Sequence, residues 1–228
     1  MRQKLTLLAI VATAGALLLS GFYFAGCNGT CTVDGPGELA GVEITEYQGV
    51  DLSSIGDFRE NSIKGPQYVD LDTYTLGITG FVETPVGLTV DEVVGDHATY
   101  EKVVTLNCVE GWSVAILWEG VLVEDLVAEA GVQPEANTVI FHAYDGYTTS
   151  LPLDYIIEND IMLARKMNGV ELPPERGAPF QLVAESKWGY KWIKWVTEIE
   201  LSDDPEYRGY WERRGYSDSA DYGERFFD

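Results

Sequence analysis

One cysteine follows a strand-like run of the chain, a position where binding and catalytic side chains are often found. Cys108 comes directly after the run Lys102–Asn107 and opens a polar turn that contains Gly111. A free cysteine often packs as a small buried hydrophobe. Its thiolate could instead act as a nucleophile with His142 as the base, although no protease or nucleophile signature surrounds either residue. The thiolate could also bind a soft metal ion, and a cofactor would then have to supply the other ligands.

Positive charge is concentrated in the second half of an acidic chain. The sequence contains 37 acidic and 15 basic residues, and ten of the 13 basic residues that follow Arg2 and Lys4 lie between Arg165 and Arg225. The densest segment, Lys187–Trp195, combines three lysines with four aromatic residues. Such a segment is typical of a strand end whose lysines extend into water, or of a site for a flat, phosphorylated cofactor. The segment Arg208–Tyr216 repeats the combination of cations and rings.

Short strands are the main elements expected to position these residues. Several runs alternate apolar and polar residues with the period of a strand, and Asn168–Gly169 is typical of a hairpin turn. The predicted strands are Tyr74–Val82, Lys102–Asn107, Thr138–Ala143, Met162–Met167, Phe180–Ala184 and Trp195–Leu201.

Short helices interrupt the strands. Thr89 and Glu92 have the spacing of a capping box, and Val121–Ala130 carries apolar residues at helical spacing. A third helix is indicated over Leu153–Ile157. Mixed sheets with inserted helices predict an α+β domain.

The composition limits the possible functions. A net charge of −22 argues against a nucleic-acid-binding protein, because such proteins carry clustered basic residues. The chain is 46% hydrophobic and 12% aromatic, which is too high for a disordered acidic chain. Three cysteines and two histidines are too few and too scattered for a zinc knuckle or a disulfide framework. We therefore expect a folded core that is stabilised by burial.

The N-terminal segment is expected to direct export. Two basic residues precede 22 uncharged residues, Leu5–Gly26, which predicts a signal peptide or an uncleaved membrane anchor over 1–26. Phe24–Cys27 resembles a lipobox, in which the cysteine would be lipidated after cleavage. Both alternatives place the protein outside the cytoplasm and tether it to a membrane. A Gly-rich polar linker is expected over 27–41, followed by one domain over 42–228.

Several motifs, in order along the chain, resemble one known family. Cys108–Ser113 followed by Trp118–Val121 closely resembles the molybdopterin-binding domain of the sulfite oxidase family. The resemblance runs from about Ile44 to the C-terminus, and it implies the sulfite-oxidase-like fold. The other matching motifs are Asp57–Gly65, Asp145–Leu153, Asn168–Pro174, Gly177–Pro179 and Gly189–Lys191.

The resemblance implies a molybdenum ion that is held by the two sulfur atoms of one molybdopterin and by the thiolate of Cys108. It implies two-electron oxygen-atom transfer on a small substrate, either reduction of a sulfoxide or N-oxide or oxidation of a sulfite-type anion. Asn61 and Lys64 would contact the pterin, while Lys191 and Lys194 would hold its phosphate. Electrons would come from a separate carrier, a haem protein or a quinone-linked membrane subunit.

The chain departs from the family pattern at two positions near Gly177–Pro179. Arg176 stands where the family usually has His or Asn, and Gln181 stands where Arg is common. A phosphate contact is therefore expected to have moved to Arg176. The leader has no twin-arginine pair, although folded relatives are often exported through one. The alternative to an enzyme is a membrane-tethered surface lipoprotein that retains the fold for binding without catalysis.

Overall fold

The structure is a computed structural model, and it describes residues 41–227. The predicted leader, 1–26, and all but the last residue of the predicted linker, 27–41, lie outside the described residues. None of the helices formed by residues 41–227 is both long enough and apolar enough to cross a membrane.

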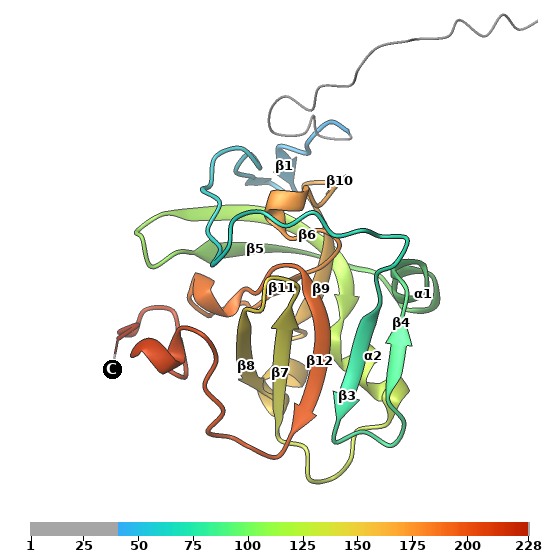
Figure 1. Ribbon diagram of the computed structural model, residues 1–228. Helices are drawn as coiled ribbons and strands as arrows, with labels where there is room; N and C mark the ends of the chain where they lie inside the picture. Colours follow the sequence, from blue (N-terminus) through green and yellow to red (C-terminus); the bar gives the residue numbers. More distant parts are fainter. Residues whose placement is uncertain (1–40, 228) are drawn as a thin grey trace, which may run out of the picture. The chain divides into compact units, whose positions relative to one another are not determined.

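Two five-stranded sheets carry the fold (Figure 1). The first sheet is antiparallel, with strand order β10-β9-β6-β5 and β11 paired to β9. Its strands are β5 (Tyr100–Asn107), β6 (Ser113–Leu122), β9 (Met162–Met167), β10 (Val170–Glu171) and β11 (Gln181–Val183).

The second sheet has the order β4-β3-β12-β7-β8 and is mixed, because β3 and β12 run parallel while the other neighbours are antiparallel. A small hairpin, β1 (Glu46–Tyr47) with β2 (Val50–Asp51), precedes both sheets. The strands of the second sheet are β3 (Leu76–Gly80), β4 (Val86–Leu88), β7 (Thr138–Ala143), β8 (Thr148–Pro152) and β12 (Val196–Ser202).

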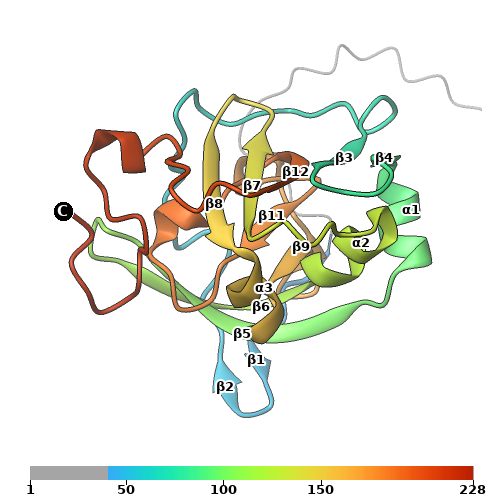
Figure 2. The ribbon, with the colours of Figure 1, turned by 90° about the horizontal axis from the view of Figure 1, so that it is seen from below.

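Helices are short, and α2 joins the two sheets. This helix, labelled α2 in Figure 2, contacts both β3 and β6. It buries Leu126 and Val127. The helices are α1 (Val90–Asp96), α2 (Val123–Ala130) and α3 (Leu153–Glu158), and the 3₁₀ turns are η1 (Pro174–Arg176), η2 (Gly189–Lys191) and η3 (Glu212–Arg214). The predicted α+β class is confirmed, as are all three helices.

All six predicted strands are present, β7 and β9 with the predicted ends and the other four with shifted ends, but the longest described strand, β6, was not predicted. Residues 114–122 are apolar almost without interruption and nearly all buried, so the segment lacks the period of two that identifies a half-exposed strand. The apolar pattern of the helix predicted from Val121 begins in this strand, and α2 itself starts at Val123.

The hairpin turn at Asn168–Gly169 is confirmed, since the two residues have φ of 48° and 78°. Asn168 is also fully buried. Its carboxamide oxygen accepts a hydrogen bond from the Leu117 amide at 3.1 Å, and its Nδ2 donates to the Ser53 carbonyl at 2.9 Å. The turn therefore fixes β9 and β10 against β6 and against the segment that leads to the site.

Candidate active site

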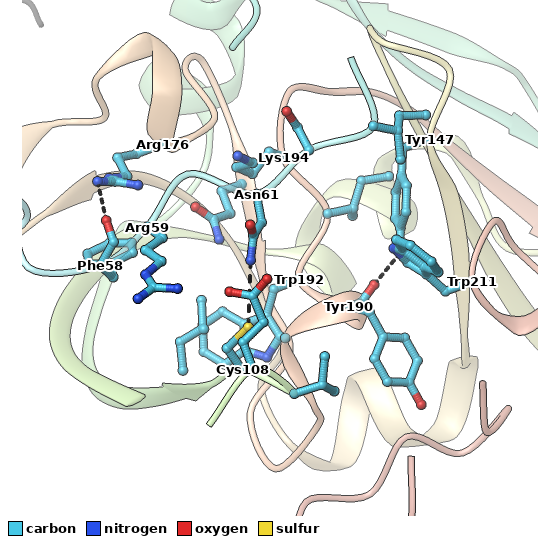
Figure 3. Close-up of a pocket in the computed structure, with 18 of the residues that line it drawn as sticks. Phe58, Arg59, Asn61, Cys108, Tyr147, Arg176, Tyr190, Trp192, Lys194 and Trp211 are labelled. Carbon is cyan, nitrogen blue, oxygen red and sulfur yellow. Dashed lines mark hydrogen bonds between the residues drawn. The ribbon is translucent and has the colours of Figure 1, made fainter. Parts of the chain in front are cut away.

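A cavity of about 300 Å³ lies where β5 ends. Its walls come from segments far apart in the sequence: 58–63, the turn between β5 and β6, the turn at 145–147, η1 with the following strand, η2 with residues 192–195, and the C-terminal segment (Figure 3). The β5–β6 turn is closed by two backbone bonds, from the Cys108 amide to the Trp112 carbonyl at 2.9 Å and from the Gly111 amide to the Cys108 carbonyl at 3.0 Å.

Cys108 lines this cavity as a free thiol and is 8% exposed. Burial raises the pKa of the thiol, while the backbone at Glu110 and the side chain of Asn61 act in the opposite direction. The Asn61 Nδ2 lies 3.7 Å from the sulfur and is the donor of this hydrogen bond (Figure 3). A bound cation would displace the proton and hold the sulfur as thiolate.

His142 is not the partner of Cys108. It lies on β7, outside the lining of the cavity, and its Nε2 is 2.8 Å from a carboxylate oxygen of Glu200 on β12. No histidine of residues 41–227 lines the cavity, so His142 does not supply the base that a cysteine hydrolase would need. The thiol does face the cavity, as a metal ligand would have to.

Glu110 and Trp112 form a brace beside the thiol. The Trp112 Nε1 donates to a Glu110 carboxylate oxygen at 3.2 Å. Hydrogen bonds from Asn61 and Trp112 lower the pKa of Glu110, so its carboxylate is ionised and holds the amide that reaches Cys108. Arg59 also lines the cavity and is exposed.

Two partly buried cations line another part of the cavity. The Lys194 Nζ lies 2.7 Å from Glu60 Oε1 and donates to the Glu175 carbonyl at 3.2 Å. It also lies 4.3 Å from the centre of the Trp195 ring. Burial lowers the pKa of Lys194, and Glu60 opposes that shift. The ammonium group is thus held in place beside the cavity by neighbours on three segments.

Arg176 is the second of these cations. Its guanidinium donates to the Phe58 carbonyl at 2.6 Å and stacks 4.2 Å from the centre of the Phe58 ring. Its Nε is buried without a hydrogen-bond partner, and so is the hydroxyl of Ser62, which lines the same cavity. Gln181 also lines it and is buried. Buried donors without partners are costly, so these groups are suited to a ligand that carries acceptor atoms.

The structure does not bring all six predicted site residues together. Asn61, Cys108, Arg176 and Lys194 line the cavity, whereas Lys64 and Lys191 do not. The expectation that Lys191 holds a phosphate is not supported, because its Nζ is buried 2.6 Å from Glu212 and 3.0 Å from the Ser150 carbonyl. Lys64 is exposed and lies near the turn at Gly146.

One wall of the cavity is aromatic and was not predicted as part of the site. It consists of Tyr147, Tyr190, Trp211 and Tyr216. The Tyr147 hydroxyl donates to the Tyr190 carbonyl at 2.5 Å (Figure 3). The signals were present in the sequence, since Tyr147 lies in a family motif and Trp211 in the basic aromatic segment, but nothing in the sequence placed the two segments side by side.

A flat cofactor with a thiolate-binding metal and a phosphate fits these residues. The cavity offers one thiol, the rings of Trp112 and Trp192, and partly buried cationic donors at Arg176 and Lys194. The unpartnered Arg176 Nε is the observation that tests the fit most directly, because a phosphorylated ligand would supply the acceptor that the protein does not.

Comparison with known proteins agrees with this chemistry and identifies the class of protein as an oxidoreductase. Residues 63–211 match the model of the oxidoreductase molybdopterin binding domain, and the chain belongs to this family. It is an enzyme of the sulfite-oxidase-like group with a molybdenum–molybdopterin cofactor, and the alternative of a non-catalytic surface protein is not supported.

Several individual proteins are similar to this chain. The uncharacterized oxidoreductase YuiH of Bacillus subtilis is 37% identical over 66% of this chain and 76% of its own length. The protein-methionine-sulfoxide reductase catalytic subunit MsrP of Gluconobacter oxydans is 34% identical over 57% of this chain and 47% of its own. The crystal structure of the sulfane dehydrogenase SoxCD from Paracoccus pantotrophus matches with a TM-score of 0.58 at 26% identity, covering 61% of this chain and 41% of that one. The chain therefore spans about half or less of the MsrP and SoxCD chains.

Proposed function

We propose that this chain reduces a small, neutral sulfoxide or N-oxide outside the cytoplasm, with Cys108 as the protein ligand of molybdenum. The single observation that carries the proposal is the buried Cys108 thiol, which faces a cavity that also presents an unpartnered Arg176 Nε and the Lys194 ammonium. Asn61 and Lys194 would hold the thiolate and the pterin phosphate respectively, and Arg176 would add a second phosphate contact.

The charges near Cys108 favour a neutral substrate over sulfite. Sulfite is a dianion and would require several basic residues beside the metal. Arg59 is the arginine whose charge lowers the pKa of Cys108, and the carboxylate of Glu110, on the same turn as the thiol, acts in the opposite direction. Arg213 and Arg214 lie outside the lining of this cavity. The named activity of the similar MsrP subunits, reduction of methionine sulfoxide, agrees in class with this choice.

The bound molybdenum–pterin group would supply two-electron oxygen-atom transfer. The net reaction converts a sulfoxide, two protons and two electrons into a thioether and water. The side chains of this protein would position the reactants: Asn61 donates to the Cys108 sulfur, and the Glu110–Trp112 pair holds Asn61. The electrons would come from a separate carrier, a haem protein or a quinone-linked membrane subunit.

Metal analysis and turnover test the proposal together. Protein purified from a molybdate-supplied host should contain about one molybdenum and one pterin per chain, and should oxidise a reduced viologen dye when a neutral sulfoxide is added. Cys108→Ser should lose molybdenum or turnover because a hydroxyl is a poor ligand for this soft site. Thermal unfolding serves as the folding control. Full activity of Cys108→Ser would refute the assignment, and sulfite oxidation without sulfoxide reduction would replace the substrate class.

The proposed location outside the cytoplasm rests on the sequence of residues 1–27. Cleavage before Cys27 would remove Arg2 and Lys4 and leave an acidic domain attached through a lipid. We expect the full-length protein to fractionate with membranes, and Cys27→Ala to release it if lipidation is the anchor. Membrane association that survives Cys27→Ala would indicate the uncleaved helix, and recovery of both proteins in the cytosol would overturn the proposed location.

A further inference from the structure

A second hollow lies beside the Cys108 cavity and carries two arginines. It is lined by Gly146, Thr148, Tyr207, Tyr210, Arg213 and Arg214. We propose that this hollow binds an oxyanion, namely a carboxylate, sulfate or phosphate group. The proposal goes beyond the function proposed above. Anion binding in the hollow does not depend on that function, whereas a role of the hollow in substrate binding rests on it.

The hollow and the cavity share two walls. Along the turn into β8, Asp145 and Tyr147 line the cavity, while the intervening Gly146 and the following Thr148 line the hollow. In the C-terminal segment, Tyr210 lines the hollow and its neighbour Trp211 lines the cavity. The rings of Tyr147 and Tyr210 lie 5.7 Å apart at this boundary. The two spaces are thus neighbours, and the paired rings of Tyr147 and Tyr210 lie between them at this point.

The distribution of ion pairs sets this hollow apart. Of the 13 basic residues among residues 41–227, seven have a carboxylate oxygen from the same part of the chain within 4.0 Å and six do not. In a chain with 37 acidic residues, a cation without a carboxylate neighbour is noteworthy. Three of the six gather here, because Arg213 and Arg214 line the hollow and the Lys64 Nζ lies 3.6 Å from where a Cβ on Gly146 would be. The others are Arg59, Arg176 and Arg225.

The two arginines are held by backbone and rings. The Arg214 guanidinium lies 3.5 Å from the centre of the Tyr210 ring and donates to the Tyr210 carbonyl at 2.5 Å. The Arg213 Nε donates to the Arg208 carbonyl at 2.5 Å, and its guanidinium lies 5.5 Å from the Tyr207 ring. A guanidinium has five N–H donors, so most of those on each arginine stay available to a ligand. Fixed guanidinium groups lose little conformational entropy when they bind an anion.

These features select an oxyanion as the ligand. Planar guanidinium groups bind carboxylate, sulfate and phosphate through paired hydrogen bonds. The net charge of −22 repels anions from the rest of the surface, so a local group of unpaired cations would concentrate them at this point. Two sources share this chemistry. The oxyanion is either a charged group at the far end of a substrate whose uncharged sulfoxide end enters the Cys108 cavity, or a free anion that acts as an effector.

Sulfate titration of the cofactor-loaded enzyme tests the site. At ionic strength held constant with chloride, calorimetry should show saturable sulfate binding to the wild type and at least tenfold weaker binding to Arg213→Gln/Arg214→Gln. Arg225→Gln is the matched control, because Arg225 is an exposed cation without a carboxylate partner that lines neither the hollow nor the cavity. The control should bind sulfate like the wild type, and the pterin content of all three proteins should be equal.

Absence of saturable binding, equal binding by the double variant, or an equal loss in Arg225→Gln would overturn the proposal. Loss of pterin from the double variant alone would also overturn it, because the hollow would then belong to the cofactor. These binding measurements need no turnover. The anion site can therefore be refuted while the proposed reductase activity stands, and the reductase activity can be refuted while the anion site stands.

Kinetics with two sulfoxides then separate the two sources. One substrate carries a carboxylate and the other is neutral. If the hollow binds the substrate, the double variant should raise KM at least tenfold for the carboxylate-bearing sulfoxide and leave KM for the neutral one unchanged. If it binds an effector, both KM values should stay unchanged, while sulfate alters the rate of the wild type and not that of the double variant.

Discussion

The Lys191 Nζ lies 2.6 Å from Glu212 Oε1, and both side chains are buried, at 1% and 0% exposure. The pair connects η2, which borders the Cys108 turn, to η3 in the C-terminal segment. The same carboxylate oxygen accepts a hydrogen bond from the Thr149 hydroxyl at 2.8 Å. Burial lowers the pKa of Lys191, and Glu212 acts against that shift. The pair thus holds in place the segment that supplies Trp211 and Tyr216 to the cavity.

Removal of one partner of this pair should destabilise the protein strongly. Glu212→Gln keeps the shape of the side chain but leaves the Lys191 ammonium buried without its counter-charge, and the expected loss is about 3–5 kcal/mol in the free energy of unfolding by urea. Asp218→Asn is the control, because Asp218 pairs with Arg208 at 2.8 Å on the surface and should cost about 1 kcal/mol or less. Equal losses in the two variants would show that the buried charge is compensated in another way.

Gly209 should be required for docking of the same segment. A Cβ on this residue would lie 2.3 Å from the Thr148 carbonyl oxygen and 2.7 Å from the Thr149 Cα, both of which are backbone atoms that cannot move aside easily. We expect Gly209→Ala to lower the unfolding midpoint and to reduce sulfoxide turnover, because Trp211 would shift. Gly87→Ala, where a Cβ would meet nothing within 4 Å, should leave both quantities nearly unchanged.

The sequence could predict elements better than their assembly. Period-two alternation is clearest in the segments of β3 and β12, and the Asn168–Gly169 pair identified the hairpin, because these signals are local. The strand β6 is buried on both faces and therefore has no alternation. The parallel pairing of β3 with β12 joins segments more than a hundred residues apart, and no local pattern encodes it.

In the site, too, the sequence predicted single residues better than the contacts between distant segments. Cys108 could be recognised from its place at a strand end and from the surrounding motif, and the structure places it in the cavity. Lys191 and Lys194 belong to one motif and look equivalent in sequence, yet the 3₁₀ turn η2 sends Lys191 into the interior, where Glu212 neutralises it. The position of Glu212 could not be anticipated, since it is set by how the C-terminal segment packs on β8.

The capping box of α1 should make stability depend on pH. The Thr89 amide and hydroxyl both lie 2.8 Å from Glu92 Oε2, and these hydrogen bonds lower the pKa of Glu92. A carboxyl group whose pKa is lower in the folded state stabilises the protein above its unfolded pKa, and this contribution disappears as the pH falls through the folded pKa. Glu92→Gln should therefore lower the melting temperature at pH 7 and have little effect in strong acid. Glu135→Gln, which changes an exposed loop carboxylate, should leave the melting temperature unchanged at both pH values. A decrease in the melting temperature of Glu92→Gln that persists in strong acid would contradict the mechanism.

Cofactor retention should depend on Arg176 and Lys194 rather than on Lys191 or Lys64. A hydrogen bond to a charged group contributes about 1.5–3 kcal/mol, so Arg176→Gln or Lys194→Ala should each weaken pterin binding by roughly tenfold or more. Pterin released per chain after dialysis measures this loss. Lys64→Ala is the control, because Lys64 is exposed and does not line the cavity, and its pterin content should equal that of the wild type.

The two departures from the family pattern, at Arg176 and Gln181, allow a second test of the predicted pterin contact by Arg176. Gln181 lines the cavity together with Arg176, and the family pattern places Arg at the position of Gln181. If the cationic contact has moved between these two positions, Gln181→Arg should restore pterin retention to Arg176→Asn, since the guanidinium would again reach the cavity from β11. Full pterin retention by Arg176→Asn alone would show that Arg176 does not contact the cofactor. An equal loss of pterin from Arg176→Asn and from Arg176→Asn/Gln181→Arg would show that the guanidinium acts only from η1. There the Phe58 carbonyl and ring hold it.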